Sequence, residues 1–199
     1  MHDASRDHYS VMVEDIINES IRVKQSLTIE DIATVSKMAS GIASAFEANH
    51  RVFLFGNGGS AADAQHIAAE FVNRFQMDRR PLPAIALTVD SSILTSIGND
   101  FSYEDTFIRQ LQALGLTGDI ALGISTSGNS PNVLKGLKWA QANELRTFGW
   151  TGACRSEMDA CCDLVLHAPS KVTARIQECH ITLGHAICAL VDEMLFGNK

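Results

Sequence analysis

The sequence predicts an α/β fold, a three-layer α-β-α sandwich built on a five-stranded parallel sheet and preceded by two helices. Short apolar runs alternate with segments of helical periodicity, which indicates parallel strands joined by right-handed crossovers. The 199 residues are 46% hydrophobic, which is enough apolar material for one sizeable core. The four prolines all lie outside the expected strand interiors. We therefore expect a doubly wound sheet with helices on both faces.

The first 49 residues are expected to form two amphipathic helices. Thr28 stands three residues before Asp31, a spacing typical of a capping box at the start of the second helix. Both helices must bury their apolar stripes, either against the same chain or against another subunit. The stripes comprise Ile16, Ile17, Ile21, Val23 and Leu27 in the first helix and Ile32, Val35, Met38, Ile42 and Phe46 in the second.

Strands and helices alternate through the rest of the chain. We interpret residues 1–199 as one domain, in which the helices of 1–49 serve packing or oligomerisation and 50–199 form the α/β core with a C-terminal helix. Strands are predicted at 51–55, 84–87, 120–124, 147–150 and 164–166. Helices are predicted at 61–75, 92–97, 103–114 and 131–143, near residue 157, and from about 173 to 195.

Composition and charge disfavour several kinds of partner and cellular location. The net charge is −7 without a basic cluster, which disfavours nucleic acid and anionic membranes as partners. No segment resembles a signal peptide, and no run approaches the roughly 20 apolar residues of a membrane span. The five cysteines contain no CxxC pair, which favours reduced thiols over a disulfide framework. We expect a cytoplasmic protein.

The loop that follows the predicted strand 120–124 has the features of a phosphate site. It contains the hydroxyls of Ser125, Thr126, Ser127 and Ser130, and Pro131 then begins a helix. The first N–H groups and the dipole of a helix favour a bound anion. An ordinary polar loop with Ser130 as N-cap is the alternative. Because that alternative needs one hydroxyl and the loop has four, we favour the phosphate interpretation.

Two other loops are candidates for ligand contacts. After the first strand, Gly58 and Gly59 would let the backbone approach a ligand, with Asn57 and Ser60 as polar contacts. This loop matches neither a dinucleotide fingerprint nor a P-loop, and a tight strand-to-helix turn explains it almost as well. The Gly-Asn-Asp sequence 98–100 would be an unremarkable helix end by itself.

A candidate chemical centre lies on two helices. His66 and Glu70 are four residues apart and share a helix face, as half of a metal site or as an acid–base pair. The last helix carries Gln177 and His185, which are separated by a rise of about 12 Å and an angular offset of about 80°. For both residues to meet one metal ion, the helix must be irregular or a neighbouring subunit must contribute. Otherwise the two residues serve different sites.

In this order, the motifs GNGGS, His-x-x-x-Glu, GND, STSGNS and RIQE with a later histidine resemble those of the phosphoheptose isomerases. These enzymes belong to the sugar isomerase (SIS) domain superfamily, and the resemblance spans about residues 44–195. It implies the flavodoxin-like SIS fold and a homotetramer with active sites between subunits. It also implies one Zn²⁺ per subunit, bound by His66, Glu70, Gln177 and His185.

The resemblance further implies isomerisation of sedoheptulose 7-phosphate to D-glycero-D-manno-heptose 7-phosphate. We expect Glu70 to move the carbon-bound proton, His185 to shuttle protons between the two oxygens, and zinc to polarise the carbonyl. One departure is Ala174, where some members have an acidic residue. The expected substrate-binding residues are Asn57, Gly58, Gly59, Ser60, Glu70, Asn99, Asp100, Ser125, Thr126, Ser127, Ser130 and Gln177.

Other functions of the same fold stay open at the level of sequence. Some SIS proteins are non-enzymatic adaptors that bind the bacterial replication initiator, and others sense sugar phosphates as regulators. An adaptor would not need Glu70 or His185, and the acidic balance disfavours a DNA-binding regulator. Isomerisation of another ketose phosphate or of an N-acetylhexosamine phosphate is a further alternative, because fold alone decides none of these.

Overall fold

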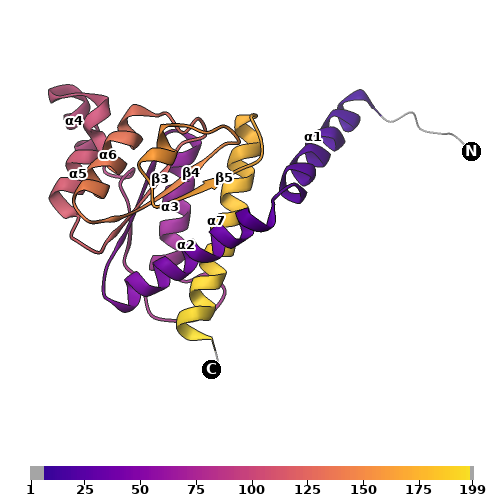
Figure 1. Cartoon of the computed structure of the whole chain (residues 1–199). Coiled ribbons are helices and arrows are strands. Elements are labelled where there is room, and N and C mark those ends of the chain that lie inside the picture. Colours follow the sequence, from indigo (N-terminus) through magenta and orange to yellow (C-terminus); the bar gives the residue numbers. More distant parts are fainter. Residues whose placement is uncertain (1–6, 198–199) are drawn as a thin grey trace, which may run out of the picture.

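The computed structural model of the chain describes residues 7–197 and contains a five-stranded sheet between two layers of helices (Figure 1). All paired strands are parallel, and their order is β2-β1-β3-β4-β5. This confirms the predicted fold class. The strands are β1 (Val52–Gly56), β2 (Ala84–Ala86), β3 (Ile120–Ile124), β4 (Arg146–Thr151) and β5 (Leu164–His167).

The sheet order creates a switch point between β1 and β3. From β1 the chain crosses to β2 on one side, and the later strands then add on the other side. In open α/β sheets of this order, ligands bind where the loops diverge at the carboxyl ends of the strands. The loops after β1 and β3 flank this point, and they are the same loops that the sequence predicts to bind ligand.

Each face of the sheet has its own apolar core. On β1, Val52 and Leu54 pack with one set of helices, whereas Phe53 and Phe55 pack with the other. The first face is covered by α2 (Ile29–Glu47), α3 (Gly59–Val72) and α7 (Thr173–Phe196). The second is covered by α5 (Thr106–Leu114) and α6 (Pro131–Ala142), with α4 (Ser91–Asp100) packed beside α5.

Several predicted boundaries were wrong. α3 ends at Val72 rather than at residue 75, because the guanidinium of Arg79 donates hydrogen bonds to the backbone carbonyls in the last turn of α3. α4 continues through residues 98–100, so Gly98 lies inside the helix instead of ending it. The predicted helix 103–114 is divided into a 3₁₀ turn, η1 (Tyr103–Asp105), and α5, and the short helix near residue 157 is the 3₁₀ turn η2 (Glu157–Ala160).

The two N-terminal helices have different environments. The capping box at the start of α2 is confirmed, because the Thr28 N–H donates to Asp31 at 2.9 Å and the Asp31 N–H donates to Thr28 at 3.1 Å. α2 buries Val35, Met38 and Phe46 in the core, although Ile32 stays 59% exposed. By contrast, α1 (His8–Gln25) extends from the body of the protein and buries no residue (Figure 1).

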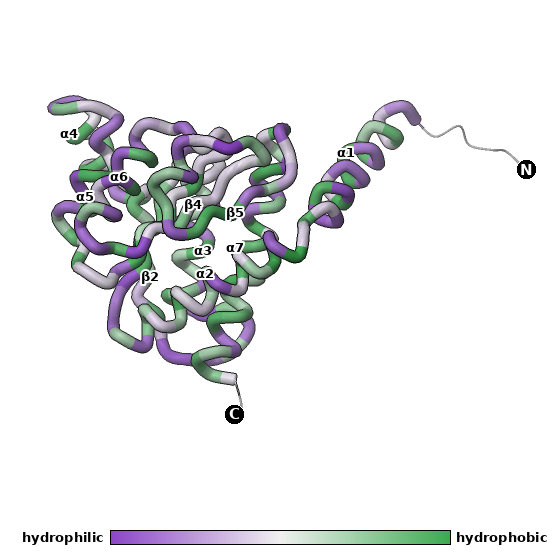
Figure 2. The backbone as a smooth tube through the Cα atoms, in the orientation of Figure 1, coloured by the Kyte–Doolittle hydropathy of each residue, from purple (hydrophilic) through white to green (hydrophobic). Residues whose placement is uncertain are grey.

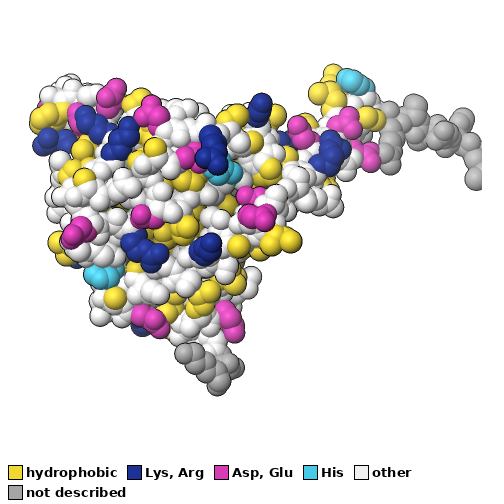
Figure 3. All heavy atoms as spheres, in the orientation of Figure 1, with side chains coloured by type: hydrophobic (Ala, Val, Ile, Leu, Met, Phe, Trp, Pro, Cys, Tyr) yellow, Lys and Arg dark blue, Asp and Glu magenta, His cyan; other side chains and the backbone are white. Residues whose placement is uncertain are grey.

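The exposed surface of α1 is partly apolar. Apolar and polar residues follow one another along the helix, and apolar side chains lie exposed among acidic and basic ones (Figures 2 and 3). The guanidinium of Arg175, on α7, joins α1 to the core by bonding the carbonyl of Ile16 and the carboxylate of Glu19, both at 3.2 Å. Val23 packs against the core, whereas Ile16, Ile17 and Ile21 are exposed and available to another surface.

α7 is the one helix in residues 7–197 that is long and apolar enough to cross a membrane by composition alone. Its apolar residues, such as Ile187 and Val191, lie in the core against α2, α3 and the sheet. Its apolar character therefore matches that of a core helix. The five cysteines are free, and Cys154 is the exposed one among them.

Gly184 sets how closely α7 packs. A Cβ at this position would lie 2.7 Å from Ile67 on α3 and 3.0 Å from Trp150 on β4. We therefore predict that Gly184→Val lowers the free energy of unfolding by about 1–3 kcal/mol, because overpacking displaces neighbouring side chains. Urea denaturation measures the change. Thr182→Val, on the exposed side of the same helix, is the matched control, and an equal loss in both variants would contradict close packing at Gly184.

Candidate active site

A cavity of about 290 Å³ lies at the carboxyl edge of the sheet, at the switch point. It is bounded by the loop after β1, the loop after β3 and the first turns of α7. The structure thus brings together eight predicted site residues. The lining residues are Asn57, Gly58, Gly59, Ser60, Ile124, Ser125, Thr126, Ser130, Thr173 and Gln177.

Three helices begin at this cavity. α3 begins at Gly59, α6 at Pro131 and α7 at Thr173, and residues from the first turn or N-cap of each line the space. Within the described chain, none of the three N-cap residues makes a side-chain capping bond. The three helix dipoles, whose positive ends meet at this cavity, therefore favour an anion here. The attraction is local, because the whole chain is acidic.

The hydroxyl loop presents donors and acceptors to the same space. The Ser125 hydroxyl lies 2.8 Å from that of Ser130 and 3.3 Å from that of Ser127. The loop turns at Gly128, whose φ of 68° and contact with Ser156 leave no room for a side chain. Uncharged hydroxyls next to helix N-termini are suited to bind phosphate oxygens.

Two residues that sequence analysis missed hold Asn57 in place. Asn57 and Asn132 exchange two amide hydrogen bonds of 2.9 Å, and the Tyr103 hydroxyl donates to Asn57 at 2.9 Å. The amide of Asn132 directly after Pro131 was a signal that could have been used. Tyr103 gave no signal, because it comes from a separate turn of the chain. Asn57 is therefore rigidly oriented beside the cavity.

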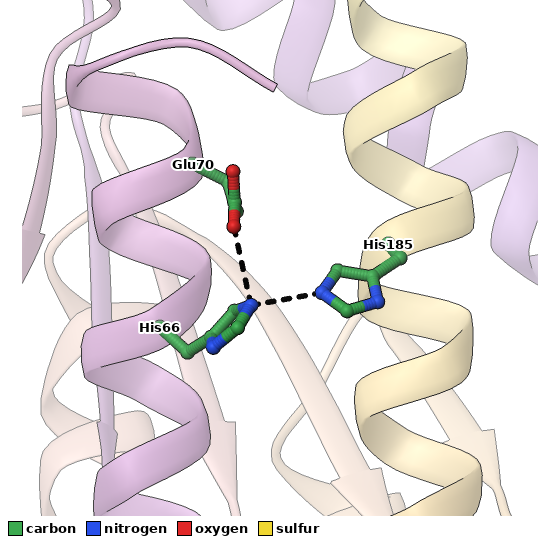
Figure 4. Close-up of side chains that lie close together, drawn as sticks. All are labelled: His66, Glu70 and His185. Carbon is green, nitrogen blue, oxygen red and sulfur yellow. Dashed lines mark hydrogen bonds and ion pairs between the residues drawn. The ribbon is translucent and has the colours of Figure 1, made fainter. Parts of the chain in front are cut away.

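A second group of side chains lies between α3 and α7 (Figure 4). His66 Nε2 is 3.2 Å from Glu70 Oε1 and 2.9 Å from His185 Nε2. His66 and Glu70 extend from α3, one turn apart, and His185 extends toward them from α7. The Phe75 ring stacks on His185 with centroids 5.5 Å apart and fixes its orientation. We call His66, Glu70 and His185 the His–Glu cluster.

The His–Glu cluster is chemically suited to two tasks. Its three candidate ligand atoms lie within 4.8 Å of one another. Two imidazole nitrogens and a carboxylate oxygen are ligands that Zn²⁺ prefers, so the residues fit this metal. Imidazole and carboxylate groups are also the side chains that most often serve as general acids and bases in catalysis. The same three side chains could therefore form a metal site or an acid–base centre.

Gln177 lies apart from the His–Glu cluster along α7. The helix is continuous through residues 177 and 185, so the irregular-helix alternative is not realised. The Gln177 side chain packs against Gly59 and lines the cavity at the helix N-termini, a position that favours a ligand contact there. Its role as a metal ligand stays a prediction.

Three other predicted residues lie outside the lining of the cavity. Asn99 and Asp100 are exposed in the last turn of α4, where the Asn99 amide donates to Asp100 at 2.8 Å. Ser127 is also exposed, and its hydroxyl accepts a bond from the Asn129 N–H at 3.2 Å. Contacts of these residues with a substrate stay predictions.

The cavity and the His–Glu cluster lie along the same pair of helices. α3 and α7 both follow parallel strands and pack on one face of the sheet, so they run in the same direction. Gly59 contacts Gln177 near their starts, and His66 contacts His185 further on. The two sites are therefore seven residues apart on α3 and eight residues apart on α7, an axial separation of about 10 to 12 Å.

The family model, the related sequences and the solved structures that resemble this chain all point to one family. The model of the SIS domain family matches residues 16–152. Phosphoheptose isomerase of Aneurinibacillus thermoaerophilus is 48% identical over 189 residues, covering 94% of this chain and 96% of that protein. Phosphoheptose isomerase 2 of Campylobacter jejuni is 52% identical over 182 residues, covering 90% of both. The solved phosphoheptose isomerase of Neisseria gonorrhoeae has a TM-score of 0.85 at 40% identity, covering 93% of this chain and 99% of that chain.

A buried histidine of α7 lies beside the end of β4. His180 is fully buried on α7, and its Nε2–H donates to the Thr151 carbonyl at 3.0 Å. Among the described residues, its Nδ1 atom has no partner. Burial therefore lowers the pKa of His180 to about 4, although the bond to Thr151 opposes this shift.

The low pKa of His180 predicts a pH dependence of stability. Between pH 6.5 and pH 4 the unfolded chain binds a proton at His180 that the folded protein does not, so stability is complete above this window and falls as pH falls through it. At about 1.4 kcal/mol per pH unit, the loss reaches about 3 kcal/mol. Urea midpoints measured across the window should decline less steeply in His180→Gln. Parallel pH profiles in both proteins would contradict a neutral His180.

Proposed function

This chain belongs to the phosphoheptose isomerase family of SIS domain proteins, and from this we propose that it isomerises sedoheptulose 7-phosphate to D-glycero-D-manno-heptose 7-phosphate in heptose biosynthesis. The main structural support is the register of α3 and α7. It separates an anion cavity from an acid–base cluster by about 10 to 12 Å along the two helices. A sugar phosphate needs both sites at once, one for each end of the molecule.

The separation agrees with the length of a seven-carbon substrate. The reacting carbons are C1 and C2, whereas the phosphate is attached at C7. With bonds of about 1.5 Å, an extended zigzag chain advances about 1.3 Å per bond, so C1 and the phosphorus of the substrate are about 10 Å apart. The substrate can therefore place its phosphate among the helix N-termini while C1 and C2 reach His66, Glu70 and His185.

The proposed reaction moves one proton between two carbons. Glu70 takes a proton from C1 of the ketose, which forms the enediol, and returns a proton to C2 to give the aldose. His185 transfers the hydroxyl proton from O1 to O2, so no atoms are gained or lost. The arrangement supports these roles because Glu70 and His185 approach one point from two helices. Phe75 keeps the imidazole of His185 oriented.

We include one Zn²⁺ per subunit in the proposal. His66, Glu70 and His185 would hold it, and Gln177 is the fourth ligand that the family resemblance predicts. Because a zinc-bound Glu70 would be a weakened base, the proposal includes a substrate-dependent shift in coordination that frees its carboxylate. When bound, the ion supplies a positive charge that polarises the carbonyl and stabilises negative charge on the enediol. The position of Gln177 in the cavity supports its contact with substrate more directly than metal binding.

We also propose a cytoplasmic homotetramer. The exposed apolar side chains of α1, including Ile16, Ile17 and Ile21, support burial against another copy of the chain. An apolar groove of about 550 Å³ between α2 and α7 is a second surface of the same kind, lined by residues such as Ile32 and Leu190. In such an assembly a neighbouring subunit could bring Asn99 and Asp100 to the substrate.

An isomerase assay tests the proposed function. Metal-free and zinc-loaded protein should differ, with turnover of sedoheptulose 7-phosphate stimulated by zinc. Glu70→Gln and His185→Ala should each lower kcat by about 100-fold or more, because each removes a proton-transfer group. Absence of turnover in folded, zinc-loaded wild-type protein would contradict the proposal and favour another sugar phosphate or a protein-binding role. Near-normal turnover by Glu70→Gln would contradict the assignment of the base.

Sedimentation analysis tests the role of α1. Ile17→Asp should shift the protein from tetramer to smaller species, because it would bury a charge in an apolar interface. Asn18→Asp is the matched control, since it adds the same charge at an exposed neighbouring position. A tetramer that persists unchanged in Ile17→Asp would exclude α1 from the interface.

A further inference from the structure

Arg79 and Asp192 form a buried ion pair near the His–Glu cluster. Arg79 Nε donates to Asp192 Oδ1 at 2.9 Å, and each side chain is only 2% exposed. Arg79 lies in the irregular segment between α3 and β2, whereas Asp192 lies on α7. Neither residue contacts the substrate cavity. A buried ion pair gives little net stability relative to apolar side chains, so its value lies in the geometry that it specifies.

The guanidinium of Arg79 caps the end of α3. It donates to the Glu70 carbonyl at 2.8 Å, to the Phe71 carbonyl at 2.7 Å and to the Asn73 carbonyl at 3.3 Å. The last carbonyls of a helix have no partners within the helix, so these bonds determine where the final turn lies. That turn carries the carboxylate of Glu70. Arg79 therefore fixes the backbone from which Glu70 extends.

Asp192 connects this capped turn to the other half of the cluster. It lies seven residues after His185 on the same helix, or about two turns further along. The ion pair thus joins the turn that carries Glu70 to the helix that carries His185. The same irregular segment carries Phe75, which stacks on His185, and Arg79 bonds its Asn73 and Arg80 carbonyls.

From these contacts we propose that Arg79 and Asp192 are positioning residues, which hold Glu70 at its working distance from His185. The inference rests on the proposed isomerase function. Neither residue touches substrate, and Asp192 lies fifteen residues, or about 22 Å, beyond the cavity residue Gln177 along α7. Loss of the pair should therefore impair proton transfer while substrate binding stays intact.

Kinetics of three variants test this role. In Arg79→Met and in the isosteric Asp192→Asn, kcat with sedoheptulose 7-phosphate should fall about 10-fold to 100-fold, because small displacements of a reacting group are costly. KM should stay within about twofold, since the phosphate site is unchanged. Arg79→Lys should also have a low kcat, because an ammonium group cannot bond several carbonyls and Asp192 together.

Asp119→Asn is the matched control. Asp119 is 1% exposed and accepts N–H bonds from Arg51 at 2.8 Å and Leu116 at 3.0 Å, far from α3 and α7 along the chain. All proteins are assayed well below their Tm, so that a general loss of stability does not lower kcat. A kcat in Asp192→Asn no lower than in Asp119→Asn would overturn the proposal. A KM that rises in proportion to the fall in kcat would overturn it as well.

Hydrogen exchange provides a readout that does not depend on activity. Amides at the end of α3, such as that of Asn73, should exchange faster in Arg79→Met and Arg79→Lys than in wild type. Their exchange rates should be unchanged in Asp119→Asn. Equal exchange in all proteins would overturn the capping role. If the wild type lacks isomerase activity while exchange increases as expected, the proposed function fails and the capping role stands.

Discussion

The close parallel packing of α3 against α7 is the constraint on which the site depends. Both helices begin at the carboxyl edge of the sheet and descend along the same face. Gly59 and Gly184 remove the side chains that would keep them apart. Because the two helices stay in register, Gly59 faces Gln177 at one level and His66 faces His185 at another. A shift of one helix by a single turn would separate these pairs.

The sheet topology supplies the anion site without any fixed positive charge. The order β2-β1-β3-β4-β5 places the loops after β1 and β3 side by side, and α7 adds a third helix N-terminus. Peptide dipoles and hydroxyls then favour a phosphate in a chain whose net charge is −7. Further along α3 and α7, the ionisable side chains of the His–Glu cluster converge. The phosphate-binding cavity and the catalytic groups therefore lie at different levels along the same two helices.

Sequence analysis predicted those features that depend on local pattern. Alternating apolar runs gave the strands, and the hydroxyl loop and the His66–Glu70 spacing indicated the two parts of the site. Helix spacing also left open that Gln177 and His185 serve different sites, whereas the misplaced end of α3 and the orientation of Asn57 depend on tertiary contacts. Arg79 ends α3 from nine residues beyond Glu70, and Asn132 and Tyr103 orient Asn57 from distant parts of the chain. Spacing within one segment carries no information about such contacts.

The most direct test of the two-site account is a comparison of ketose phosphates that differ in chain length. The phosphate-to-C1 distance grows by about 1.3 Å with each added carbon, so five- and six-carbon substrates fall short of an axial separation of about 10 to 12 Å. The account predicts that kcat/KM is highest for sedoheptulose 7-phosphate and declines with each carbon removed. Equal kcat/KM values for six- and seven-carbon substrates would show that the separation between the cavity and the His–Glu cluster does not select the substrate.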